Sequence, residues 1–237
     1  MSQTAKSELE TITNMYRQKR YDECLREVKS KLKQSPDSLH LLNYQAMAYT
    51  ALKRDKDALL SYQKIIKKDR TLPGPYYNMG IILKRNERTE EAIANYKKAI
   101  SLKPDYVQAY NNLGAIYKNN EEYKNAIKMF TKAMELQPDH QNSYYNLALI
   151  KKEQGLSEEA VEFLLKLLDL NPDHNDAKAL LKKFFALDPK YMLQCIDEAI
   201  KTNPKNANNY HNRAVLLKET KRTEDAEENY RKAIQLN

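Results

Sequence analysis

Histidine and cysteine side chains, which could bind a metal ion or transfer a proton, are few and widely separated in this sequence. The histidines and cysteines are His40, His140, His174, His211, Cys24 and Cys195. They lack the close spacing of metal ligands, and the sequence has no GxGxxG, P-loop, HExxH or GxSxG motif. Paired glutamates such as Glu90 and Glu91 lie at the start of predicted helices, where their negative charge interacts favourably with the positive end of the helix dipole. We therefore expect no enzyme activity, no metal and no cofactor.

Amides and cations recur at regular intervals, and their chemistry suits the binding of a polypeptide. Two series repeat every 34 residues, namely Asn78, Asn112, Asn146 and Lys84, Lys118, Lys152. An asparagine amide can donate one hydrogen bond to a backbone carbonyl and accept another from a backbone N–H. The formal net charge of the chain is +8, which favours acidic partners.

An internal repeat supplies the elements that position these residues. Pro104, Pro138 and Pro172 are 34 residues apart, and each follows an apolar segment: AISLKPD, AMELQPD and LLDLNPD. Tyrosine opens a second phrase at the same interval, in YYNMG, YNNLG and YYNLA. Between these phrases apolar residues recur at three- and four-residue spacing, which predicts pairs of amphipathic helices. Gly80 and Gly114 would let the two helices of a pair approach closely.

This pattern resembles the tetratricopeptide repeat (TPR) family. The resemblance implies an all-α fold, an α-solenoid forming a right-handed superhelix of about seven TPR helix pairs. We expect one array over residues 1–237, with repeats at 5–38, 39–72, 73–106, 107–140, 141–174, 175–206 and 207–237. The sixth repeat is degenerate and two residues short, so shorter helices are expected there. The seventh is truncated, which would leave Ile234 and Leu236 facing further repeats or a partner at the C-terminal edge.

In the TPR family the first helix of each pair lines a concave groove, and the resemblance therefore implies which residues would face a bound segment. These are Asn78, Asn112, Asn146 and Asn212, the cations Lys84, Arg85, Lys118, Lys152 and Lys218, and the side chains Tyr77, Asn111 and Tyr145. The asparagine series resembles that of the TPR arm of O-GlcNAc transferase, although asparagine at this position can also bond within the fold.

The resulting prediction is a non-catalytic protein-interaction scaffold that binds an extended, acidic segment of a partner within a multi-subunit assembly. The alternative is the substrate-recruiting arm of an O-GlcNAc-transferase-like enzyme without its catalytic domain. Nucleic acid is disfavoured as a partner, because the aromatic residues belong to the repeat core and are not interleaved with the lysines.

Localisation is inferred from composition alone. No apolar run approaches the ~20 residues that a membrane-spanning helix needs, so no membrane span is expected. We expect a cytoplasmic protein, with the cilium or the nucleus as alternatives.

Overall fold

The computed structural model describes residues 3–236, and side chains from Leu9 onward. Residues 1, 2 and 237, which the expected array includes, lie outside this range. The chain divides into two compact units, Met1–Leu113 and Gly114–Asn237, and every helix or strand assigned in the described residues is an α-helix. The first helix of each pair is called the A helix and the second the B helix.

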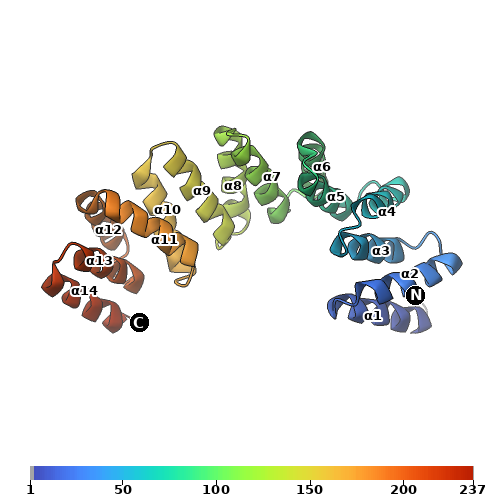
Figure 1. Ribbon diagram of the computed structural model, residues 1–237, viewed down its shortest axis with the longest axis horizontal. Helices are drawn as coiled ribbons and strands as arrows, with labels where there is room; N and C mark the ends of the chain where they lie inside the picture. The colour runs from blue at the N-terminus through green and yellow to red at the C-terminus, as the bar shows by residue number, and fades with distance from the viewer. Residues whose placement is uncertain (1–2, 237) are drawn as a thin grey trace. The chain divides into compact units, whose positions relative to one another are not determined.

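In the first unit the helices succeed one another as antiparallel neighbours (Figure 1). They are α1 (Gln3–Arg17), α2 (Tyr21–Gln34), α3 (Leu39–Ala51), α4 (Asp55–Lys68), α5 (Pro73–Arg85), α6 (Thr89–Leu102) and the start of α7 (Val107–Asn119). The second unit contains the rest of α7, then α8 (Tyr123–Leu136), α9 (Gln141–Glu153), α10 (Ser157–Leu170), α11 (Asn175–Leu187), α12 (Pro189–Thr202), α13 (Ala207–Glu219) and α14 (Thr223–Leu236).

The helix boundaries confirm the predicted helix pairs. Six A helices, α3 to α13, begin at residues 39, 73, 107, 141, 175 and 207, which are the predicted repeat starts. Within six of the pairs the turn from A to B helix contains one residue with positive φ: Lys19, Lys53, Glu87, Glu121, Gly155 and Lys221. A left-handed residue of this kind ends a helix and reverses the chain. The fold is thus an all-α solenoid of helix pairs.

Close contact between the helices of a pair depends on a small residue in the A helix. A Cβ atom built on Gly80 would lie 2.7 Å from the Tyr96 ring, and one built on Gly114 would lie 2.9 Å from the Phe130 ring. Both rings are fully buried. The next pair has Ala148 and Leu164 at the same positions, also fully buried. The predicted close approach at the two glycines is confirmed.

The expectation of shorter helices in the sixth repeat is wrong. Helices α11 and α12 have 13 and 14 residues, as in the neighbouring pairs. The two missing residues come from the turn, which is reduced to Asp188 alone. Asp188 ends α11 and caps α12, because its carboxylate accepts a hydrogen bond from the Tyr191 backbone N–H at 2.9 Å.

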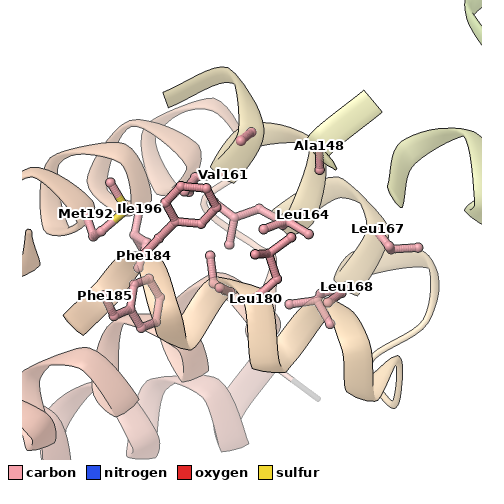
Figure 2. Packing of buried hydrophobic residues seen from close by; sticks show 14 of the residues in the cluster. Ala148, Val161, Leu164, Leu167, Leu168, Leu180, Phe184, Phe185, Met192 and Ile196 are labelled. Atoms are coloured by element: carbon pink, nitrogen blue, oxygen red, sulfur yellow. The ribbon is translucent and has the colours of Figure 1, made fainter. Parts of the chain in front are cut away.

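The short turn brings α12 against α10 as well as α13, and the sixth repeat contributes to a large apolar cluster (Figure 2). Leu164 and Leu168 from α10 meet Leu180 and Phe184 from α11 there, together with Met192 from α12. The repeat that looked degenerate in sequence is therefore an integral part of the core of the second unit.

The cap that Asp188 provides should contribute to the stability of the protein. Replacing Asp188 with alanine should cost about 0.5–2 kcal/mol, because the N-terminus of α12 loses its side-chain cap. Asparagine keeps the accepting oxygen and should restore most of this loss. Urea unfolding of the three proteins provides the measurement, and equal midpoints would contradict a capping role.

Candidate functional site

The predicted site residues of the first unit lie on α5 and α7, and two of them meet. The Asn112 Nδ2 donates to the Tyr77 hydroxyl at 3.2 Å, and the Tyr77 ring packs on the Tyr106 ring with centroids 4.7 Å apart. Burial raises the pKa of Tyr77, and it raises the pKa of Tyr106 to about 12. Asn112 is thus engaged in a half-buried aromatic cluster on successive A helices. Tyr106, which belongs to this cluster, was not among the predicted residues.

The neighbouring asparagines of this unit are partly buried as well. Burial raises the pKa of Tyr62 to about 12, while hydrogen bonds with Thr50 and Asn78 act in the opposite direction. Asn78 thus lies near Tyr62, a tyrosine of the preceding B helix. Asn111 is half-buried, and its Oδ1 has no hydrogen-bond partner among the described residues.

The two predicted cations of the first unit lie next to each other in the sequence. Lys84 and Arg85 are both exposed at the end of α5. Arg85 forms an ion pair with Asp55, and Asn86 donates to the same carboxylate at 2.8 Å. Asp55 begins the preceding B helix, 30 residues away, so sequence spacing within one repeat did not indicate it. This contact offsets the Arg85 charge.

In the second unit a lysine and an asparagine of the predicted series meet directly. The Lys118 Nζ donates to the Asn146 Oδ1 at 2.8 Å, from α7 to α9. The Asn146 Nδ2 in turn donates to the Asn142 carbonyl at 2.8 Å. The lysine of α7 therefore lies beside the asparagine of α9, the next A helix of this unit. Lys152 and Lys218 are exposed at the C-terminal ends of their helices.

The remaining predicted residues of this unit lie at a ring contact and at a cavity. The Tyr145 ring packs on the His174 ring with centroids 5.3 Å apart. Asn212 borders a cavity of about 370 Å³ together with Lys178 and His211. Ile234 borders the same cavity and is 75% exposed.

The part of the chain that the structure describes contains both cysteine thiols and all four histidines. No cluster of three or more His, Cys, Asp or Glu residues there could hold a metal ion. Cys24 is buried and Cys195 partly buried, and burial raises the pKa of both thiols, which lowers their reactivity. Among the described helices, none is long and apolar enough to cross a membrane.

Family models match three segments of the chain. A model described as TPR repeat matches residues 82–121, and two models described as tetratricopeptide repeat match residues 105–173 and 195–228. The chain is a tetratricopeptide repeat protein. The expectation drawn from the repeat pattern is confirmed, and TPR folds commonly serve as non-catalytic modules for protein interaction.

Solved structures of TPR proteins resemble this one. MamA is 26% identical over 69% of this chain and 95% of its own, with a TM-score of 0.63. YrrB, described as a TPR protein with an unusual peptide-binding site, is 19% identical over 74% of this chain and 90% of its own, with a TM-score of 0.61. A TPR protein from Parabacteroides merdae is 17% identical over all of this chain and 94% of its own, with a TM-score of 0.67. Comparison with curated protein sequences gave no match.

Proposed function

We propose that this TPR protein is a non-catalytic interaction scaffold that binds an extended, acidic segment of a partner protein on its A helices. The contact between Lys118 and Asn146 carries the proposal. It places a cation beside an amide on adjacent A helices, so that a carboxylate of the ligand could meet the ammonium group while its backbone meets the amide. The exposed Lys152 extends the positive charge along α9.

Several amides of this surface bond within the free protein, so a ligand would share or replace those bonds. Asn112 could exchange its bond to Tyr77 for one to a ligand backbone at little cost, because Tyr77 is only partly buried and its hydroxyl could bond water instead. The cations then contribute most of the preference for an acidic ligand. A second contact, with a partner or further repeats, is proposed at the exposed Ile234.

Charge reversal on the A helices tests the proposal. The probe is a fluorescein-labelled decapeptide of glutamate, aspartate and glycine, followed by anisotropy. Changing Lys84, Lys118 and Lys152 together to glutamate should weaken its binding at least about tenfold, and binding to the wild type should fall as salt rises.

A matched control separates a specific surface from a general effect of net charge. Lys98, Lys124 and Lys128 are exposed on the B helices, and their change to glutamate alters the net charge equally. We expect less than about a threefold loss in this control. Equal losses in the two triple variants, or binding that is insensitive to salt, would contradict the proposal. The substrate-recruiting alternative uses the same surface and shares this test.

A further inference from the structure

A second surface of this protein has the opposite charge and is built mainly from B helices of the second unit. Here α10 and α12 lie side by side, and the start of α13 closes one end. A cavity of about 340 Å³ runs between them, lined by the carboxylates Glu158, Glu162, Asp169 and Glu198 and by one cation, Lys166. Glu158 also lines a second cavity, of about 460 Å³, together with Leu156 and Leu187. Leu156 directly precedes α10, and Leu187 ends α11. We call the two together the α10–α12 groove.

The carboxylates at the two ends of the first cavity meet neutral donors. The Tyr191 hydroxyl donates to Glu158 at 2.9 Å, which joins α12 to α10. At the other end, burial raises the pKa of Asp169, while hydrogen bonds from Asn206 and Asn208 act in the opposite direction. Between them Glu162 pairs with Lys166 at 2.6 Å. The negative charge of Glu158 and Asp169 is therefore not balanced by these contacts, and a cation could approach it.

Asn209 adds an unusual polar group to the lining of this groove. Its side chain is only 3% exposed, and its Oδ1 has no hydrogen-bond partner among the described residues. The equivalent positions of five other A helices hold residues that are also buried: Leu41, Pro75, Ala109, Ser143 and Ala177. Ser143, the polar one among them, bonds His140 at 2.8 Å. A buried amide oxygen without a partner is a costly feature in a core, and an N–H donor from a ligand would satisfy it if the Asn209 amide turned toward the cavity that it lines.

The apolar end of the groove is exposed as well. Leu187 is 82% exposed and Leu156 is 42% exposed, and both lie beside the one-residue turn at Asp188. Along α10, from Glu158 to Asp169, the groove extends for roughly 16 Å at 1.5 Å per residue. This length accommodates a short segment with an apolar side chain at one end and cations along the rest.

We propose that the α10–α12 groove binds a short basic segment of a partner protein, with lysine or arginine side chains against Glu158 and Asp169, a donor to Asn209, and one apolar side chain against Leu156 and Leu187. This surface is separate from the proposed A-helix surface and prefers a ligand of opposite charge. The two proposals can therefore fail independently.

The corresponding positions of another B helix carry the opposite charge. At the positions of Glu158 and Glu162, α8 has Lys124 and Lys128. These lysines are exposed on a helix of the same length, so the fold accepts either charge there. The double change Glu158→Lys and Glu162→Lys should therefore leave the protein folded while reversing the charge of the groove.

Three fluorescein-labelled dodecapeptides serve as probes in an anisotropy titration of the full chain. The first carries lysines and glycines with two adjacent leucines at one end, the second has glutamate in place of every lysine, and the third has alanine in place of both leucines. We expect the first peptide to bind most tightly and the second not to bind this groove. Absence of binding by the first peptide at millimolar concentration would overturn the proposal.

Variants locate the binding of the first peptide. The double change E158K and E162K should weaken it at least about tenfold. Glu224 and Glu228 occupy the same positions on α14 and are exposed, so E224K and E228K form a control with equal net charge and an expected loss below about threefold. Equal losses in the two pairs would overturn the proposal.

The neutral change Asn209→Ala supplies a readout that does not depend on net charge. It should weaken binding of the first peptide by about threefold or more, because the N–H donor of the peptide loses its acceptor. Helical circular dichroism matching that of the wild type would show that the variant is folded. Unchanged affinity in this folded variant would contradict the assigned role of Asn209.

Discussion

Replacing Gly114 with leucine is expected to lower the free energy of unfolding by about 1–3 kcal/mol or more, because the added side chain has no room. Even a single Cβ would lie 2.9 Å from the Phe130 ring, closer than carbon atoms ordinarily approach. The ring is fully buried and so cannot turn aside into solvent. Helices α7 and α8 would have to separate, and their buried contacts would be lost. Urea denaturation followed by circular dichroism measures the change.

Two matched variants show whether the close approach is the cause. Gly74 also lies in a helix, and a Cβ there would meet nothing within 4 Å. Gly74→Ala should therefore cost less than Gly114→Ala, and any cost comes from the local clash of a Cβ with the ring of Pro75, which follows it in the helix. The double change Gly114→Ala and Phe130→Leu copies the buried pair Ala148 and Leu164 of the next repeat. It should be more stable than Gly114→Ala alone, whereas equal stabilities would show that the ring does not limit the space.

Repetition explains why the helix pairs could be predicted from the sequence. Each repeat presents the same order of small, apolar and turn residues. An atypical residue in one repeat therefore does not change the assignment, because the other repeats have the usual residue at that position. The predicted starts at residues 73, 107 and 141 are therefore the starts of α5, α7 and α9. Gly80 and Gly114 could be assigned to helix contacts for the same reason, since both precede a large aromatic residue by 16 positions.

Features that depend on contacts between repeats could not be predicted in this way. Lys19, Glu87 and Lys221 adopt positive φ although the left-handed region favours glycine, because the flanking helices hold the turn in place. The two residues absent from the sixth repeat could have been lost from a helix or from the turn, and the prediction of shorter helices assigned the loss to the helices. The structure places the loss in the turn, at Asp188.

The candidate site was predicted as a set of residue types, without their partners. The spacing indicated that Arg85 and Lys118 belong to A helices, and the structure bears this out. It did not indicate that Arg85 pairs with Asp55 or that Lys118 bonds Asn146. Side chains of this length reach the next helix pair, so their partners depend on how neighbouring repeats pack. A count of charges along one helix therefore overstates the charge available to a ligand.

The largest loss of stability is expected from Phe184→Ala, at about 3–5 kcal/mol. Phe184 is 5% exposed and lies in one apolar cluster with Val161, Met192 and Ile196, where helices α10, α11 and α12 meet (Figure 2). Removing the ring would leave a cavity at the point where the one-residue turn holds α12 in place. Leucine fills much of the same volume, so Phe184→Leu should cost clearly less than alanine.

Native-state hydrogen exchange, together with urea unfolding, tests this expectation on the whole chain. In Phe184→Ala the amides of α10 to α12 should exchange faster, since the affected contacts lie within the second unit. Leu187 is on the same helix but 82% exposed, and Leu187→Ala should change stability by no more than about 0.5 kcal/mol. If Phe184→Ala instead cost no more than Leu187→Ala, the sixth repeat would be loosely packed, and α12 would owe its position to the cap at Asp188 alone.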